Sequence, residues 1–478
     1  MDYEIVIGLE VHAQLLTKSK MFCSCGTDYT NAAPNTHVCP VCLGMPGVLP
    51  VINRQAVEYT VMTALALGCT VPEYTKFDRK NYCYPDLMKG YQISQFDAPI
   101  GLHGSLIIDS EAGKKKIGIT RVHLEEDVAK SWHRGDYSLI DVNRAGIPLM
   151  ETVSEPDIRS PEEARDYLIK IRNILRYLGV STGNMEEGSF RCDANISLRP
   201  RGTEQLFSKV EVKNLNSFKA VYQSLKYEAK RQKKLLEQGG RTVQETRGWI
   251  EGEGVTVVQR SKEYADDYRY FPEPDLPPLI LEKAWVEGIN AKLPELPEAK
   301  RERFVVQYGL PLYDASVLTA SKALAAYFEE TLKIAGNSKA KVVSNWLLGD
   351  FSRLLNLNAL DIESTKVSPE CLVEMLELID REVINGPATK TVFEEMFYSG
   401  KHASEVIKEK GLNQINDADE LKMVIKQVIE DNAKSVADFK GGKQQALTFL
   451  IGHVMKATRG RANPAMVKDI LIRELGEK

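Results

Sequence analysis

The 478-residue sequence predicts an α+β fold: one domain with a mixed or antiparallel sheet, followed by two all-α domains. Several segments before residue 214 alternate apolar and polar side chains with the period of a strand, and segments with helical spacing lie between them. After residue 298 the spacing is helical. Because the proline-rich stretches 272–278 and 293–297 mark a stiff exit, we expect domains at 1–293, 294–404 and 405–478.

The composition is that of an ordinary globular protein, with 43% hydrophobic and 27% charged residues. No apolar run approaches the ~20 residues that cross a bilayer, and Met1–Glu4 is acidic rather than signal-like. We therefore expect a cytoplasmic protein with no membrane partner. The net charge of −4 argues against nucleic-acid binding over the whole surface but is compatible with a local basic patch.

The first predicted strand, residues 5–16, places Glu10 and His12 opposite its apolar side chains. A segment that follows it holds Cys23, Cys25, Cys39 and Cys42. The spacing of the last two lets both thiolates reach one tetrahedral zinc, whereas the single residue between the first two is less typical. Four reduced, unliganded cysteines are the alternative. Because glycine, proline and asparagine leave this segment little core, we favour a structural zinc knuckle at 23–42.

Residues 78–95 are polar, aromatic and basic without helical periodicity, which predicts an ordered functional loop or a strand pair. Arg79, Lys80 and Lys89 are candidate phosphate-binding residues, and a solvated loop is the alternative for each of them. The chain contains no Gly-x-Gly-x-x-Gly and no Walker A motif, so any nucleotide must be held by other means.

Four further predicted strands carry polar side chains on one face. These are His123, Glu125 and Asp127 in 119–127, Asp141 and Asn143 in 139–151, Arg191, Asp193, Asn195 and Ser197 in 191–198, and Glu211 in 209–213. A solvated sheet face would show the same pattern. Two carboxylates about 4 Å apart repel by about 4 kcal/mol at a dielectric near 20, so a cluster needs protons or cations. Mg²⁺ suits carboxylates and phosphates, while His12 suits Mn²⁺ or an outer role better.

Predicted helices should cover the apolar face of this sheet. They run from about Asn53 to Leu67, from a capping box at Ser160 to Leu178, and from Ser217 to Gln238, and a glycine follows each of them. In the helical region we expect one helix over Leu318–Ala335 and another that opens at Ser368-Pro369.

The tail carries the local basic patch. From Lys440 to Lys468 the chain has six basic residues and no acidic one. A surface helix with ordinary lysines is the alternative, but this imbalance inside a net acidic chain favours contact with a phosphate backbone.

Six motifs, in order along the chain, closely resemble the B subunits of the tRNA-dependent Asp/Glu amidotransferases. They are Ile7–His12, Asn81–Asp86, Asn143–Glu151, Asn184–Ser197, Glu211–Ser217 and Asp266–Pro272, and the likeness continues through Met455–Pro464. The resemblance implies a glutamine-synthetase-like cradle domain, a helical domain and a tail similar to a small stand-alone helical family. It also implies ATP as cosubstrate and a three-subunit complex, in which the partners are the amidase and a small third subunit.

The family's reaction converts Glu-tRNA(Gln) to Gln-tRNA(Gln), or Asp-tRNA(Asn) to Asn-tRNA(Asn). By resemblance, this chain phosphorylates the misacylated side-chain carboxylate with ATP, and ammonia from the amidase partner then displaces phosphate. An acid-lined sheet with nearby cations suits this chemistry, because phosphoryl transfer depends on positioning and charge neutralisation.

We assign site residues on the same basis. One cation site is expected at His12, Glu125 and Glu151 and a neighbouring one at Glu10, Asp193 and Glu211, with Glu10, His12, Glu125 and Glu151 as the catalytic set. The predicted ATP-phosphate ligands are Arg79, Lys89, Arg191 and Lys213. The predicted tRNA contacts are Lys440, Lys443, Lys456, Arg459 and Arg461.

Two positions depart from familiar relatives: Cys83 stands in place of a phenylalanine, and Ala129 in place of a glycine. We therefore do not expect phosphate binding by close backbone approach at the second position. No segment resembles an amidase or glutaminase apparatus, so ammonia must come from a partner. A free-standing carboxylate–amine ligase for a small molecule and a non-catalytic tRNA-binding scaffold remain alternatives; the basic tail argues against the first.

Overall fold

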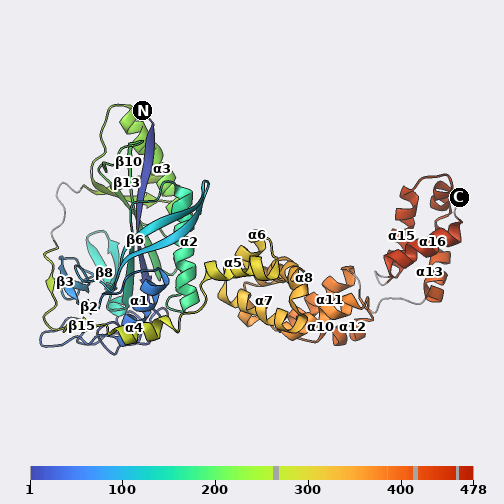
Figure 1. Cartoon of the computed structure of the whole chain (residues 1–478), viewed down its shortest axis with the longest axis horizontal. Coiled ribbons are helices and arrows are strands. Elements are labelled where there is room, and N and C mark those ends of the chain that lie inside the picture. The colour runs from blue at the N-terminus through green and yellow to red at the C-terminus, as the bar shows by residue number, and fades with distance from the viewer. Residues whose placement is uncertain (1, 262–267, 385, 413–417, 459–461, 477–478) are drawn as a thin grey trace. The chain divides into compact units, whose positions relative to one another are not determined.

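A computed structural model describes residues 2–261, 268–384, 386–412, 418–458 and 462–476. The chain divides into two compact units, Met1–Pro297 and Glu298–Lys478 (Figure 1). The boundary between the units falls at the end of the second predicted proline-rich stretch. The further division of the second unit at residue 404 stays a prediction.

The first unit is built around a mixed sheet that comprises, within the described residues, eight strands in the order β13–β12–β11–β10–β1–β9–β6–β5. Its strands are β1 (Tyr3–Gln14), β5 (Gly101–Ser110), β6 (Gly113–Glu126), β9 (Pro148–Ser154), β10 (Phe190–Pro200), β11 (Val210–Lys213), β12 (Glu245–Ile250) and β13 (Val255–Ser261). Neighbouring strands run antiparallel except β11 and β12, which are parallel. This arrangement confirms the predicted α+β class.

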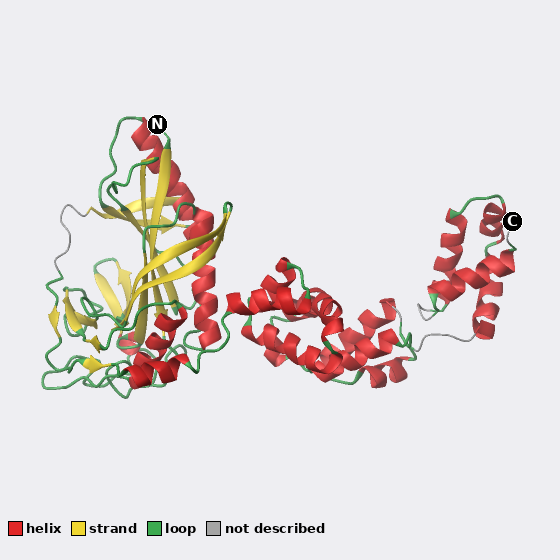
Figure 2. Ribbon diagram, in the orientation of Figure 1, coloured by secondary structure: helices red, strands yellow, loops and turns green. Residues whose placement is uncertain are grey.

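Helices α1 (Arg54–Ala66), α2 (Pro161–Leu178) and α3 (Phe218–Glu237) pack on the apolar face of this sheet (Figure 2). The predicted capping of α2 is confirmed: the Ser160 side chain accepts a hydrogen bond from the Glu163 amide, and Gly179 ends the helix at φ +70°. Ile7, Leu9 and Val11 of β1 are buried in this core. Since successive strand residues point to opposite faces, Glu10 and His12 lie on the other face.

Residues 78–95 form a strand pair, one of the two predicted alternatives. Strand β3 (Asp78–Asn81) pairs with β4 (Tyr91–Ser94) and with β14 (Phe271–Pro272). The small pairs β2 (Tyr74–Thr75) with β15 (Leu279–Ile280) and β7 (Lys130–Arg134) with β8 (Tyr137–Asp141) complete the strands described in this unit, and helix α4 (Lys283–Asn290) follows.

The prediction of one strand over 139–151 is wrong. Strand β8 ends at Asp141, a 3₁₀ turn η1 (Val142–Arg144) follows, and β9 begins at Pro148. Asp141 accepts hydrogen bonds from the amides of Asn35 and Asn143, and the Asn143 side chain accepts one from the His37 amide. These polar side chains therefore anchor the cysteine-rich segment instead of facing the acidic cluster.

The second unit is helical, as predicted. Its helices are α5 (Pro297–Tyr308), α6 (Leu312–Thr319), α7 (Lys322–Ala335), α8 (Ala340–Trp346), α9 (Ser352–Leu357), α10 (Pro369–Asp380), α11 (Gly386–Ser399), α12 (Ala403–Lys410), α13 (Ala418–Asp431), α14 (Ala433–Lys440), α15 (Gln445–Ala457) and α16 (Pro464–Leu475). The single helix predicted over 318–335 is divided because Ser321 caps α7 through the Leu324 amide. No helix in the described segments is long and apolar enough to cross a membrane.

Candidate active site

The polar face of the sheet borders a cleft of about 500 Å³ in the first unit. Six of the seven carboxylates predicted to cluster on this face line the cleft, and Asp141 does not: Glu10, Glu125, Asp127, Glu151, Asp193 and Glu211. Five basic residues line it as well: Lys80, Arg121, Arg191, Lys209 and Lys213. Charges of both signs therefore meet at one cleft, as a site for a phosphorylated substrate requires.

The strand register forms the centre of the site. Arg191 of β10 pairs with His12 of β1, His12 pairs with Glu151 of β9, and Glu151 pairs with His123 of β6. These four side chains therefore form one row across four adjacent strands. Glu125 lies two residues beyond His123 on the same face of β6.

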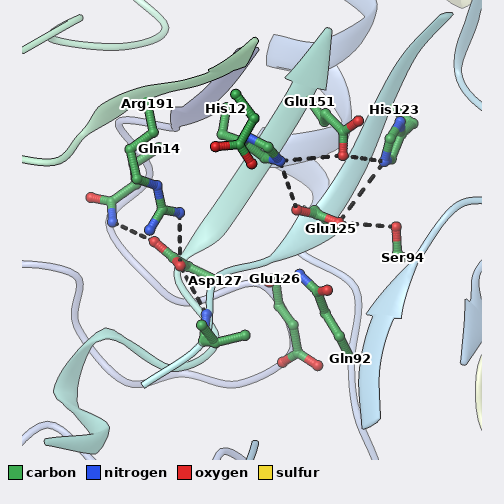
Figure 3. Close-up of polar contacts among 12 residues, drawn as sticks. His12, Gln14, Gln92, Ser94, His123, Glu125, Glu126, Asp127, Glu151 and Arg191 are labelled. Carbon is green, nitrogen blue, oxygen red and sulfur yellow. Dashed lines mark hydrogen bonds and ion pairs between the residues drawn. The ribbon is translucent and has the colours of Figure 1, made fainter. Parts of the chain in front are cut away.

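His12, Glu125 and Glu151 form the closest cluster in this row (Figure 3). The His12 Nε2 lies 3.4 Å from Glu151 Oε2 and 4.0 Å from Glu125 Oε1. One ligand atom from each residue lies within 4.8 Å of the others. In the part of the chain that the structure describes, no lysine or arginine nitrogen lies within 4.0 Å of either buried carboxylate. An imidazole and two carboxylates without a fixed cation fit a divalent metal ion.

Electrostatics within the cluster favour charged forms despite burial. Burial opposes the charge on His12, but the carboxylates of Glu151 and Glu125 outweigh it and raise the pKa of His12 to about 9. Burial likewise opposes ionisation of Glu125 and Glu151, but the facing histidines hold the pKa of both carboxyls below the ordinary value. A metal ion would compete with the proton for His12.

The second predicted cation set is not gathered into a comparable cluster within the described residues. The Lys213 Nζ lies 2.6 Å from Asp193 Oδ2 and 3.2 Å from Glu211 Oε1. The Asn195 side chain donates a hydrogen bond of 2.8 Å to Glu10 Oε1. Since an ammonium group already lies between two of these carboxylates, a second cation site at Glu10, Asp193 and Glu211 stays a prediction.

Two of the four cations predicted for ATP phosphates, Arg191 and Lys213, line the cleft. The Arg191 Nη2 donates to Asp127 Oδ1 at 2.9 Å, and Gln14 donates to Asp127 Oδ2 at 2.7 Å (Figure 3). Asp127 therefore fixes the guanidinium of Arg191 beside the His12–Glu125–Glu151 cluster.

Arg79 and Lys89 do not line this cleft. Arg79 makes two bonds of 2.6 and 2.7 Å to the buried carboxylate of Glu273 and lies over the Tyr91 ring. Lys89 pairs with Glu126 beside a different cavity, next to the cysteine-rich segment. Their partners are distant in sequence, so the local pattern could not show that these charges are already compensated.

Three basic side chains of the cleft are not among the predicted ATP-phosphate ligands: Lys80, Arg121 and Lys209. Lys80 was a candidate in the 78–95 segment, and its Nζ lies 5.0 Å from the Tyr268 ring centroid. His123 was placed on the polar face by strand alternation, but no role followed from that pattern.

The four cysteines predicted to bind zinc converge. Their sulfur atoms all lie within 4.8 Å of one another, and all four thiols are free. A hydrogen bond between Cys23 and Cys42 lowers the pKa of the Cys42 thiol and raises that of Cys23. Four soft donors that meet at one point are compatible with structural zinc.

Three of the predicted tRNA contacts can be located. Lys440, Lys443 and Lys456 are exposed, at the end of α14, in the following turn and on α15. Lys443 also pairs with Asp438 at 3.0 Å. Arg459 and Arg461 lie outside the described residues.

The sequence of this chain matches family models and known proteins. The model "GatB/GatE catalytic domain" matches residues 5–287, and "GatB domain" matches residues 326–475. The chain belongs to the GatB family that both models describe. The B subunit of the aspartyl/glutamyl-tRNA(Asn/Gln) amidotransferase of Dehalococcoides mccartyi is 57% identical over 489 residues, which cover 100% of this chain and 99% of that protein. The corresponding protein of Caldanaerobacter subterraneus is 56% identical over 479 residues, which cover 100% of both chains. The segment that matches the GatB/GatE catalytic domain contains every residue of the His12–Glu125–Glu151 cluster.

Proposed function

We propose that the chain is the component of a tRNA-dependent amidotransferase that activates the misacylated amino acid of Glu-tRNA(Gln), Asp-tRNA(Asn) or both. The observation that carries this proposal is the His12–Glu125–Glu151 cluster in a cleft lined by basic side chains, in a chain that matches relatives named as amidotransferase subunits over its full length. The enzyme is a carbon–nitrogen ligase of the cytoplasm, and its partners are an amidase and a small third subunit.

The reaction needs activation because oxide is a poor leaving group from a carboxylate. An oxygen of the substrate carboxylate attacks the γ-phosphorus of ATP, the bond from that phosphorus to the ADP oxygen breaks, and an acyl phosphate forms. Ammonia then adds to the acyl carbon, phosphate leaves, and the amide nitrogen loses a proton.

The residues of the cleft have separate tasks in this scheme. His12, Glu125 and Glu151 would hold Mg²⁺ or Mn²⁺, which supplies charge neutralisation for the phosphates. Lys80, Arg191 and Lys213 orient and neutralise phosphate oxygens, and Asp127 keeps Arg191 in place. The cysteine cluster would hold a structural zinc ion, and Lys440, Lys443 and Lys456 would contact the tRNA backbone.

The test uses the purified chain with its amidase and small partner proteins, ATP, Mg²⁺, ammonium chloride and Glu-tRNA(Gln). Free ammonium bypasses glutamine hydrolysis, so formation of esterified glutamine reports activation and amidation. We expect Gln-tRNA(Gln) with the wild type, and Glu-tRNA(Gln) left unconverted but still bound by Glu125→Gln. Equal conversion by this variant, or conversion without ATP, would refute the proposal.

A further inference from the structure

We propose that His123 is a positioning residue for the cation site: it donates a hydrogen bond from Nε2 and holds Glu125 and Glu151 in their ligating arrangement. The inference rests on the proposed function, because it takes the His12 cluster to be a cation site. It assigns a role to His123, which neither the sequence pattern nor the proposed function had given one.

The two carboxylates lie between two imidazoles (Figure 3). The His123 Nε2 lies 3.4 Å from Glu151 Oε2 and 3.9 Å from Glu125 Oε2. His12 reaches the same Glu151 oxygen but the other oxygen of Glu125, Oε1. Each imidazole therefore contacts both carboxylates, and the two oxygens of Glu125 point to different histidines.

Arg121 determines which ring nitrogen of His123 carries the proton. The Arg121 Nε lies 3.3 Å from His123 Nδ1 and can act only as a donor, so Nδ1 must accept. The proton is then on Nε2, which faces the carboxylates. A protonated Nε2 has no lone pair for a cation, so His123 is a donor to the carboxylates and not a ligand.

The two carboxylate oxygens of Glu125 have different partners. Its Oε2 accepts a hydrogen bond of 3.1 Å from the Ser94 hydroxyl and also faces His123. Its Oε1 faces His12. The Ser94 hydroxyl therefore fixes Oε2 on the side of His123, and Oε1 remains oriented toward His12. Loss of such outer donors typically costs about 10–100-fold in metal affinity.

The test measures Mn²⁺ binding to the full-length chain by electron paramagnetic resonance titration, with electron spin echo modulation to count coordinated imidazole nitrogens. The variants are His123→Leu, His123→Gln, whose amide can still donate, Arg121→Met, and His12→Gln as the ligand control. His133→Gln is the matched control, since His133 is an exposed histidine on β7 that contacts Ser138 and Tyr84.

We expect one coordinated imidazole nitrogen in the wild type, retained in His123→Gln and lost in His12→Gln. His123→Leu should weaken Mn²⁺ binding about 10–100-fold, His123→Gln should restore most of it, and His133→Gln should match the wild type. Two coordinated nitrogens, with one lost in His123→Gln, would overturn the proposal, as would unchanged affinity in His123→Leu. If His123→Leu fails to fold, Arg121→Met decides: weaker Mn²⁺ binding than in the wild type supports the proposal, and unchanged affinity overturns it. A wild type that binds no Mn²⁺ would refute the proposed cation site itself.

Discussion

His12 and Glu151 face each other across the β1–β9 ladder, with the imidazole Nε2 3.4 Å from a carboxylate oxygen. This pair joins strands far apart in the sequence and places a nitrogen and an oxygen donor at one point. Because neither carboxylate of the cluster has a lysine or arginine ion partner among the described residues, the balance of charge depends on protons or a metal ion.

Removing one charge of the His12–Glu125–Glu151 cluster should impair catalysis far more than folding. Glu125→Gln should lower ATP-dependent amidation on the order of 100-fold or more, since one preorganised electrostatic contact has that scale. The metal-free variant should still fold but be less stable than the wild type near pH 7, because it lacks the ionised carboxylate that the facing histidines favour. Amidation assays and thermal unfolding in EDTA check both. Glu253→Gln, at an exposed turn, is the control; equal losses in both variants would contradict the prediction.

Stability of the metal-free protein should depend on pH through the same cluster. The pKa of His12 is raised from 6.5 to about 9, so its contribution is complete below pH 6.5 and is lost as pH rises through about 9. The pKa values of Glu125 and Glu151 are lowered, so their contribution is present above about 4.5 and is lost as pH falls. Urea unfolding in EDTA across this range should show His12→Gln without the alkaline decline. An unchanged decline would assign it to other groups.

Loss of one cysteine should release zinc. Cys42→Ala should lower the zinc content of the purified chain and its melting temperature, because three sulfur donors hold the ion less well than four. Elemental analysis and thermal unfolding measure the two effects. Cys83→Ala, which removes an exposed cysteine outside the cluster, should change neither. Zinc retained in full by Cys42→Ala would show that the ion is bound elsewhere.

Arg79 should prove structural. Arg79→Met leaves the fully buried Glu273 carboxylate without its cationic partner, so it should destabilise the protein by about 3–5 kcal/mol. The KM for ATP should stay close to that of the wild type, whereas Lys213→Met, in the cleft, should raise it. Urea unfolding and ATP titrations at a permissive temperature distinguish the two. A large rise in the KM of folded Arg79→Met would restore the phosphate-binding role predicted from sequence.

The basic tail should contribute to tRNA affinity through salt-dependent contacts. Replacing Lys440, Lys443 and Lys456 together by alanine should weaken tRNA binding and reduce the slope of log K against log salt concentration by roughly 2–3, about 0.9 for each phosphate that is no longer neutralised. Filter binding at several salt concentrations measures this slope. A matched triple variant of Lys230, Lys233 and Lys234 on α3 should leave it unchanged. Equal slopes for the wild type and the tail variant would exclude these contacts.

The sequence by itself determined which side chains share a face. Alternation in residues 5–16, 119–127 and 191–198 was sufficient to place His12, Glu125 and Asp193 on polar faces, because the strand period is a local property of the backbone. Helix caps such as Ser160 were predictable for the same reason, since a cap depends on residues a few positions apart.

The tertiary structure alone decided which polar strand faces lie side by side and which charged side chains line the cleft. Strand register placed His12 opposite Glu151, and the turn after Asp141 turned Asp141 and Asn143 toward the cysteine-rich segment. A partner distant in the chain compensates Arg79 through Glu273, and the strand register placed His123 beside Glu151. Cross-strand pairing and charge compensation depend on contacts between segments more than a hundred residues apart or on the packing of the assembled sheet, and a local residue pattern does not encode them.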